Sequence, residues 1–192
     1  MKDETVYTDL IQLTLSGNKE AYSELYDVTI HEVYKTAHFL IDDKADVDDV
    51  VQEIYIQLYE SLRKYDSEKP FRPWLIGLAI KQIHSYRRKK VDATTNCKKE
   101  EEQRKPVQLD FSNDVISKIS NQKLIELIHK LPYKLKQVII LRYLHDYSQE
   151  EVAQILHIPI GTVKSRIHAA LKKLRQKEQV EEIFLGEVGN VK

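Results

Sequence analysis

The chain has 192 residues, 42% of them hydrophobic, which is enough to fill one large or two small cores. Only 5 Gly and 5 Pro occur, so the composition favours an almost entirely α-helical protein over strands or disorder. The single cysteine, Cys97, excludes an internal disulfide. MKDETVYTDL at the start lacks the features of a signal peptide, and the longest aliphatic run, Val138 to Leu141, is too short to cross a bilayer. We therefore expect a cytoplasmic protein without membrane insertion.

The formal net charge of +0 hides an uneven distribution of charge along the chain. Residues 1 to 60 hold 4 Lys and Arg against 14 Asp and Glu. Residues 61 to 100 hold 11 against 4, and residues 131 to 192 hold 10 against 7. This segregation predicts an acidic surface for a basic protein partner, followed by two basic surfaces for DNA.

Apolar residues at helical spacing predict two helices between Asp9 and about Ile41, divided near Gly17 and Asn18. Their expected core positions are Ala21, Leu25, Val28, Val33, Ala37 and Leu40, and we expect Tyr22, Tyr26 and Tyr34 in the core or at its edge. After a polar turn, a third helix is predicted through Val50, Val51, Ile54, Leu58 and Leu62.

The third helix has a strongly acidic first turn. Asp46, Asp48 and Asp49 oppose the positive end of the helix dipole, which stabilises the helix by about 0.3 to 1 kcal/mol for each exposed carboxylate. Capping explains one or two of them. The polar surface continues beyond the reach of the dipole at Gln52, Glu53, Gln57 and Glu60, which indicates a binding face.

A charged loop, YDSEKPFR at 65 to 72, precedes a helix whose first turn contains Pro73. The helix begins apolar, with Trp74 expected in the core, and ends in four consecutive cations at 87 to 90. Aromatic rings beside cations are typical of single-stranded DNA binding, because rings stack on bases while cations follow phosphates. The polar stretch VDATTNCKKEEEQR that follows reads as a linker between two domains.

After the linker, helices are predicted from Asp114 to His129 and from Leu131-Pro132 onward, and then a helix-turn-helix at 148 to 175. Ser148 and Glu151 form a capping box at its start, with Val152, Ala153 and Leu156 on the buried face. Pro159 ends the turn, and a second helix begins near Ile160 or Gly161. The buried face of this second helix is predicted to hold Val163, Ile167, Ala170, Leu171 and Leu174.

The opposite face of this second helix is cationic, and residues 160 to 176 include no acid. A solvated basic face on an ordinary helical hairpin is the simpler interpretation. The capped first helix, the short turn and the acid-free second helix occur together, however, and favour DNA binding in the major groove. His157 occupies the turn position that usually holds Gly with positive φ, at a small cost in strain.

We expect a protein without catalytic activity, a metal site or a cofactor. The 7 His are scattered without the spacing of a zinc site, and neither a Gly-rich phosphate loop nor a Gly-x-Ser-x-Gly elbow is present. Clustered carboxylates in the first half fit a protein-binding surface at least as well as acid and base chemistry.

Four stretches in this order resemble the extracytoplasmic-function (ECF) sigma factors of bacterial RNA polymerase. They are EAYSELYDVTIHEVYKTAHFLI at 20 to 41, DVDDVVQEIYIQLY at 46 to 59, FRPWLIGLAIKQIHSYRRKK at 71 to 90 and the segment 131 to 175. The resemblance implies an all-α fold of two small helical domains joined by a flexible linker, the second domain containing the helix-turn-helix. It places a region 2-like domain at 1–90, a linker at 91–113, a region 4-like domain at 114–178 and a tail at 179–192.

The resemblance also implies roles for individual residues. The clamp helices of the polymerase largest subunit would bind Asp46, Asp49, Gln52 and Glu53. The -10 element would meet Lys81, His84, Ser85, Arg87 and Arg88, together with the loop at 65 to 72. The -35 element would meet Thr162, Lys164, Ser165, Arg166, His168 and Lys172. The chain departs from the family pattern at Ile80-Lys81, Ser85, His157 and Ala169, so no promoter sequence is transferred.

The resemblance implies a non-catalytic initiation factor that binds core RNA polymerase and promoter DNA, for a stress or envelope-response regulon. Family members are often held inactive by an anti-sigma factor, which in many cases is membrane-bound. Two alternatives stay open at this point. A homodimeric regulator that does not join polymerase would leave the acidic helix unexplained, and a helical adaptor would bind no DNA.

Overall fold

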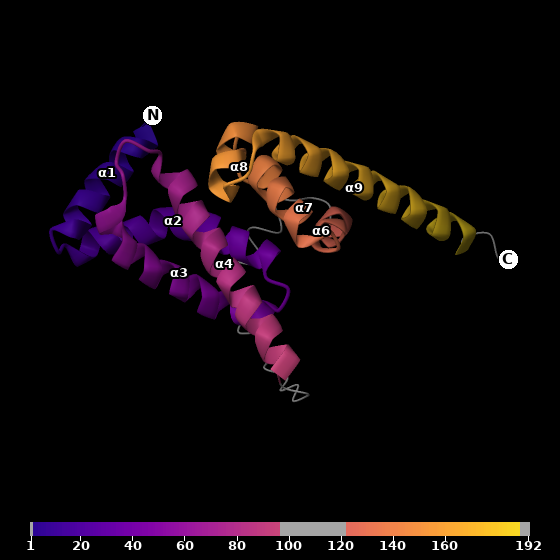
Figure 1. The fold of residues 1–192 in the computed structure, drawn as a ribbon, viewed down its shortest axis with the longest axis horizontal. Helices are drawn as coiled ribbons and strands as arrows, with labels where there is room; N and C mark the ends of the chain where they lie inside the picture. The colour runs from indigo at the N-terminus through magenta and orange to yellow at the C-terminus, as the bar shows by residue number, and fades with distance from the viewer. Residues whose placement is uncertain (1, 97–121, 189–192) are drawn as a thin grey trace. The chain divides into compact units, whose positions relative to one another are not determined.

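The computed structural model describes residues 2–96 and 122–188, with side chains described for 4–92 and 124–176 (Figure 1). Within these ranges all regular structure is helical, so the all-α prediction is confirmed. The chain divides into two compact units, Met1–Phe111 and Ser112–Lys192. Most of the predicted linker and the predicted start of a helix at Asp114 lie outside the described residues.

Over residues 2–96, the first unit packs four α-helices together with two short 3₁₀ turns. In chain order they are α1 (Lys2–Leu15), α2 (Lys19–Leu40), η1 (Lys44–Asp46), α3 (Val47–Ser61), η2 (Leu62–Lys64) and α4 (Phe71–Asn96). Helix α2 contacts α1, α3 and α4, and α3 also packs against α4. Large side chains with almost no exposure fill the space between them: Leu25, Phe39, Ile54, Leu58, Ile76 and Ile83.

The break between α1 and α2 lies where the sequence predicts it. Gly17 has φ +96, a left-handed conformation that favours glycine, and the Asn18 side chain accepts a hydrogen bond from the Ala21 amide at 3.0 Å. One predicted core position is wrong, because Val28 is 48% exposed. The buried positions in that turn of α2 are instead Thr29 and Ile30.

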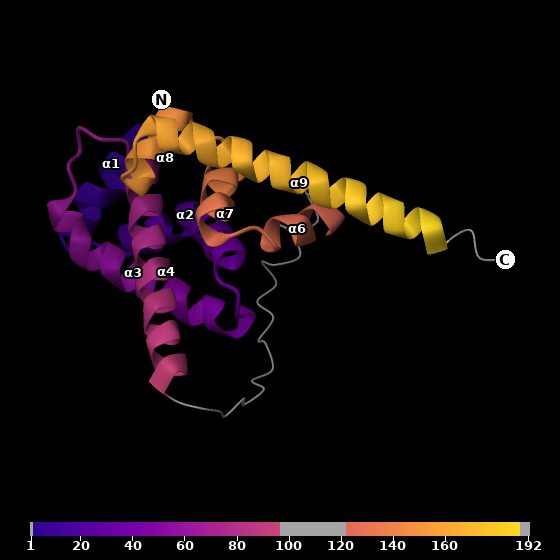
Figure 2. The ribbon, with the colours of Figure 1, turned by 45° about the vertical axis from the view of Figure 1, so that its right-hand side comes forward.

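Helix α4 is longer than predicted. It runs through Asn96, six residues past position 90, where the predicted first domain ends. Trp74 is only half-buried, and its ring packs against Tyr65 and Phe71 at centroid distances of 4.8 and 5.8 Å. In Figures 1 and 2 the C-terminal turns of α4 extend past the other helices of the first unit.

Between residues 122 and 188, the second unit contains α6 (Gln122–His129), α7 (Tyr133–Ile139), a π-helical turn η3 (Ile140–Leu144), α8 (Gln149–Leu156) and α9 (Ile160–Val188). Helix α9 packs against α6, α7 and α8. The core of the second unit includes Leu131, Ile139 and Ala170, with Leu135 and Leu174 packed around them. Figure 2 shows α9 extending well beyond the helices that it covers, and its helix reaches Val188, past the predicted domain end at 178.

The helix-turn-helix is confirmed at α8 and α9. The Ser148 hydroxyl accepts from the Glu151 amide at 3.1 Å, and the Glu151 carboxylate accepts from the Ser148 amide at 2.7 Å, which is the predicted capping box. His157 has φ 50 and ψ 47, the left-handed conformation predicted for it, and the Ile158 amide donates to the Ala153 carbonyl at 3.0 Å. The buried residues of α8 are Val152 and Ile155, whereas Ala153 and Leu156 are half-buried.

Candidate functional site

The outer face of α3 is an exposed stripe that combines acidic and apolar side chains. Residues at steps of three, four and seven lie on one side of a helix, opposite the buried Val50, Ile54 and Leu58. The exposed side holds Asp49, Gln52, Glu53, Ile56 and Glu60. Ile56 is 49% exposed, so this face carries apolar as well as charged contact area. Three of the four residues predicted for polymerase binding, Asp49, Gln52 and Glu53, lie together here.

Asp46, the fourth predicted polymerase-binding residue, points to a different neighbour. Its carboxylate accepts hydrogen bonds from the Tyr86 hydroxyl and from the Lys90 ammonium, the latter at 2.6 Å. Both partners belong to α4, 40 and 44 positions away in the chain. The structure therefore engages Asp46 with α4. Asp46 still lies beside Asp49 and Glu53, with which it lines a pocket of about 350 Å³ that side chains of α4 also line.

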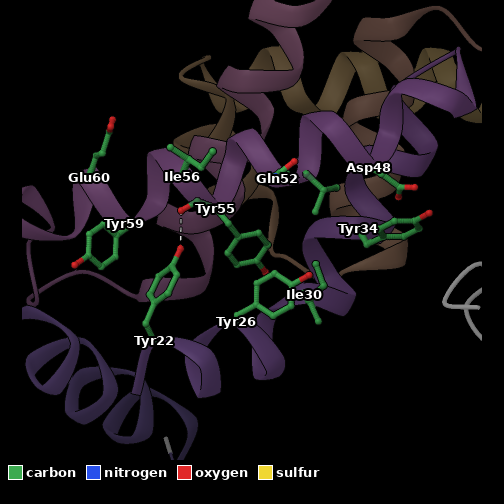
Figure 3. Close-up of a pocket in the computed structure, with 11 residues that line it drawn as sticks. Tyr22, Tyr26, Ile30, Tyr34, Asp48, Gln52, Tyr55, Ile56, Tyr59 and Glu60 are labelled. Carbon is green, nitrogen blue, oxygen red and sulfur yellow. Dashed lines mark hydrogen bonds between the residues drawn. The ribbon is translucent and has the colours of Figure 1, made fainter. Parts of the chain in front are cut away.

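A tyrosine groove of about 670 Å³ runs along α3 on the side that faces α2 (Figure 3). Figure 3 shows the rings of Tyr22, Tyr26, Tyr55 and Tyr59 gathered between the two helices, with Glu60 at one end and Asp48 beside Tyr34 at the other. Tyr59 is 56% exposed and meets the Tyr22 ring edge-on at 5.1 Å. The groove is thus largely aromatic in its middle and acidic at both ends.

Internal hydrogen bonds fix the rings of the groove. The Tyr22 hydroxyl donates to the Tyr55 carbonyl at 2.6 Å, and the hydroxyls of Tyr55 and Thr29 lie 2.9 Å apart. Burial, and then the nearby Tyr59 and Tyr26, raise the pKa of Tyr22 to about 12. Burial followed by the charge of Asp48 raises the pKa of Tyr34. Tyr22 and Tyr34 therefore stay neutral at physiological pH, and the hydrogen-bonded rings of Tyr22 and Tyr55 give the groove a fixed wall.

The groove was not predicted from the sequence, because the tyrosines of α2 were expected in the core or at its edge and those of α3 were not considered with them. Tyr22 and Tyr34 are half-buried, but Tyr26 is exposed and lines the groove. Tyr55 and Tyr59, four residues apart on the next helix, complete it. Two adjacent helices that both repeat tyrosine at helical spacing are the signal that predicts such a surface.

The predicted -10 residues fall on two faces of α4. Lys81, His84 and Arg88 are exposed and Ser85 is half-buried, and their spacing of three and four residues places them on one stripe. We call these four residues the basic stripe of α4. Arg87 lies outside the stripe, one residue from Arg88 but about 100° around the helix axis.

Arg87 contacts the end of α2. Its guanidinium lies 2.5 Å from the Asp42 carboxylate and donates to the Leu40 carbonyl at 3.2 Å. Lys90, one turn further on, lies 2.6 Å from both Asp43 and Asp46. Burial lowers the pKa of Lys90, but hydrogen bonds from its ammonium to Asp43, Asp46 and Tyr86 outweigh that effect and raise it. Two of the four terminal cations of the predicted helix are thus engaged with acidic groups of the same unit.

The loop that precedes α4 covers an aromatic cluster. Tyr65, Phe71 and Trp74 pack together, with Tyr65 and Phe71 meeting edge-on at 5.5 Å. The Tyr65 hydroxyl donates to the Lys69 carbonyl, and Lys69 pairs with Asp66 at 3.3 Å, so contacts within the loop hold its shape. Trp74 and Tyr65 are both partly exposed, which leaves ring surface available for a stacked base.

The second helix of the helix-turn-helix also presents an exposed basic stripe. Lys164, Ser165, His168 and Lys172 follow one another at steps of one, three and four residues and are all exposed. Thr162 and Arg166, four residues apart, are half-buried on the flank. Among the described side chains, none forms an ion pair with the cations of this stripe. Six predicted -35 residues therefore lie on one side or its flank.

Two further findings bear on other kinds of site. Within 2–96 and 122–188, no helix is both long and apolar enough to span a bilayer. In the same described ranges, no three His, Cys, Asp or Glu side chains are placed to share a metal ion.

Comparison with known proteins assigns both units. Residues 25–92 match the family model described as Sigma-70 region 2, and residues 121–174 match the one described as Sigma-70, region 4. The first range contains α3 and most of α2 and α4, and the second contains the helix-turn-helix. Together the two ranges cover more than half of the chain, in the order that the sequence analysis predicts.

Curated relatives share this pattern over most of their length. The chain is 27% identical to the ECF RNA polymerase sigma factor SigW of Bacillus subtilis (strain 168), over 87% of this chain and 94% of that protein. It is 28% identical to the ECF RNA polymerase sigma-E factor of Escherichia coli (strain K12), over 93% of this chain and 97% of that protein.

Among solved structures, CnrH in complex with the cytosolic domain of CnrY has the same fold, with a TM-score of 0.64 and 23% identity over 93% of this chain and 97% of that one. The sigma factor RpoE of Bartonella quintana, in complex with the anti-sigma factor NepR, also has a TM-score of 0.64, with 21% identity over 83% of this chain and 97% of that one. Two matched regions in the expected order and curated relatives along nearly the whole chain lead to one conclusion: the chain belongs to the ECF sigma factors of the sigma-70 family.

Proposed function

We propose that this protein joins core RNA polymerase in the cytoplasm and directs it to a small set of promoters, without chemistry of its own. The observation that carries the proposal is that different helices present different surfaces: an acidic and apolar outer face on α3, and basic stripes on α4 and α9. Three faces of different charge fit three different contacts. The family is regulatory, and DNA opening would be driven by binding rather than by hydrolysis.

The outer face of α3 is the proposed polymerase contact. Asp49, Gln52 and Glu53 supply hydrogen-bond acceptors for a basic partner, and the half-exposed Ile56 supplies apolar area beside them. Interfaces of this composition obtain specificity from the charges and affinity from the buried apolar centre. In this proposal the partner is the clamp helices of the polymerase largest subunit.

The two basic stripes are the proposed DNA contacts. On α4, Lys81, His84, Ser85 and Arg88 would meet the -10 element, while the aromatic cluster under the loop offers ring surface to an unpaired base. On α9, Lys164, Ser165, His168 and Lys172, with Thr162 and Arg166 on the flank, would enter the major groove of the -35 element. Phosphate contacts would supply affinity, and base contacts would select the site.

The tyrosine groove is the proposed site for an anti-sigma factor. Rings in the middle and carboxylates of Asp48 and Glu60 at the ends fit an amphipathic helix with an apolar face and a basic residue near each end of that face. Such a helix would lie beside the outer face of α3, because Gln52 and Ile56 belong to both surfaces. Its binding would therefore exclude the polymerase. A membrane-bound inhibitor is one form this partner could take.

The alternative of a homodimeric regulator is not favoured by the family assignment, and it leaves the outer face of α3 without a role. The two functions differ in what they bind. A sigma factor is monomeric alone and forms a tight complex with sigma-free polymerase, whereas a homodimeric regulator sediments as a dimer and ignores the polymerase.

The test combines association and transcription. Charge reversal at the outer face, Asp49→Lys with Glu53→Lys, should weaken binding to sigma-free core polymerase by at least about tenfold, since unlike charges become like charges at an interface. Glu24→Lys with Asp27→Lys reverses two exposed acids on α2 outside the groove lining and is the control with the same change in net charge. Reconstituted transcription on a genomic library should yield start sites that appear only when the chain is added. No association and no new start sites would refute the proposal.

A further inference from the structure

The contacts between α4 and the turn after α2 lead to an inference that rests on the proposed function and goes beyond it. We propose that Arg87 and Lys90 are positioning residues rather than DNA contacts. They bind an acidic turn, defined as Asp42, Asp43 and Asp46, and so hold the basic stripe of α4 in a fixed direction relative to the polymerase-binding helix α3.

The core alone does not hold the end of α4. The buried residues of α4 all lie in its first half: Phe71, Leu75, Ile76, Ala79, Ile80 and Ile83. After Ile83, every described side chain of α4 is at least partly exposed, although the helix continues through Asn96. The last turns therefore leave the core, and the residues that still contact neighbouring elements determine where they point.

The residues near the end of α4 that contact neighbouring elements lie on the same side of the helix as its buried residues. Tyr86, Arg87 and Lys90 follow Ile83 by three, four and seven residues, so they lie on the same side of α4 as the core. Arg88 and Lys81 lie on the opposite side, in the basic stripe. The division of cations between the two sides of α4 thus separates those that face the protein from those that face solvent.

The contacts of the acidic turn form two neighbouring groups, which together make up the network considered below. Arg87 binds Asp42 at 2.5 Å and the Leu40 carbonyl at the C-terminal end of α2, where a cation is favourably placed against the helix dipole. Lys90 bridges Asp43 and Asp46, and the Tyr86 hydroxyl donates to Asp46 and accepts from Lys90 at 3.1 Å. Burial, and then the hydrogen bond to Asp46, raise the pKa of Tyr86 to about 12, so the hydroxyl keeps its proton.

The exposure of its side chains indicates that the network affects the direction of α4 more than the free energy of folding. Its acidic side chains are 35% to 66% exposed and its cations 30% and 45%, and pairs this exposed add little to the free energy of folding. The same contacts determine the direction of the last turns of α4, because three side chains of α4 are bound to three carboxylates on one turn. Asp46 directly precedes α3, so this geometry links the DNA-reading helix to the polymerase-binding helix.

Replacing Arg87 should slow promoter opening without weakening polymerase binding. Arg87→Met in the full chain should slow promoter opening by the holoenzyme about fivefold, a typical coupling for residues in one ion-pair network, and leave affinity for core polymerase within about twofold. Arg87→Lys, which keeps the charge, should recover most of the rate. A change in polymerase affinity equal to the loss in opening would overturn the proposal.

A charge swap provides the decisive version of this experiment. Arg87→Asp should slow opening further, and adding Asp42→Arg should restore it to within about threefold of the wild-type rate, because the pair is rebuilt with its charges exchanged. The matched control is Lys89→Asp with Asp42→Arg, which carries the same net charge but does not rebuild the pair. Circular dichroism establishes that each variant is folded.

The outcomes separate this inference from the proposed function. If the swap does not restore opening, or if the Lys89 control restores it equally well, Arg87 does not act through Asp42 and the inference is wrong. If the wild-type chain supports no promoter opening with core polymerase, the proposed function fails instead.

Discussion

Helices α4 and α9 both carry clusters of cations, yet the structure uses these cations differently. In α9 the basic stripe is exposed, and none of the described acidic groups pairs with it. In α4, Arg87 and Lys90 bind the acidic turn, while Lys81, His84 and Arg88 stay exposed. The number of cations on a helix therefore does not give the number available for DNA.

The two helices are also positioned by different means. The start of α9 is set by local features: a capping box on α8, a left-handed turn residue and a proline. The end of α4 is set by contacts to residues 40 and 45 positions away in the sequence. Local devices are insensitive to ionic strength, whereas partly exposed ion pairs are screened by salt. We therefore expect salt to affect the orientation of α4 more than that of α9.

The largest effect is expected at the stripe of α9. Lys164→Ala should reduce affinity of the holoenzyme for -35 DNA by about tenfold, within the roughly 1 to 3 kcal/mol of one good base contact. Fluorescence anisotropy with promoter duplexes measures the change. Lys173→Ala removes an equal charge from the side of α9 away from Lys164 and should have a smaller effect. Equal losses in both variants would show that net charge alone, and not the stripe, determines binding.

A smaller effect is expected at the capping box. Ser148→Ala should lower the free energy of unfolding of the second unit by about 1 kcal/mol, because the Glu151 amide loses its acceptor. Denaturant unfolding followed by circular dichroism measures it. Ser148→Asp retains a capping oxygen and should stay close to wild type. If Ser148→Asp is as unstable as Ser148→Ala, the cap does not set the start of α8.

The smallest effect is expected at the turn. His157→Gly relieves a left-handed conformation that a side chain adopts at a cost, and should stabilise the second unit by less than about 1 kcal/mol. DNA affinity should not change, since His157 precedes the stripe of α9 by more than one turn. A loss of stability in thermal unfolding would mean that the His157 side chain contributes contacts of its own.

Local features were predictable from the sequence, and distant contacts were not. Ser148 and Glu151 are three residues apart, so the capping box, the left-handed His157 and the start of α9 followed from spacing alone. The wrong prediction for Val28 and the missing Ile155 came from periodicity, which fixes a helical face only to within about one residue. The polar stretch after Lys90 has the composition of a linker, yet its first six residues extend α4.

The candidate site also combines features that were predictable from the sequence with contacts that were not. The exposed stripes of α3 and α9 follow from helical spacing, which the sequence displays. The partners of Asp46 and Arg87 do not, because Tyr86 and Asp42 lie 40 and 45 positions away and only the packing of α2, α3 and α4 brings them together. Identical charges in neighbouring positions, such as Arg87 and Arg88, cannot be distinguished without that packing.

The salt dependence of DNA binding tests most directly the claim that the two sides of α4 have different roles. The measurement is the slope of log affinity against log salt concentration for holoenzyme on promoter DNA, compared among wild type, Arg88→Met and Arg87→Met. Arg88→Met should make the slope less steep by about 0.7 to 0.9, the contribution of one phosphate contact, and Arg87→Met should leave it unchanged. An equal reduction in both variants would contradict the account, because it would place Arg87 on DNA.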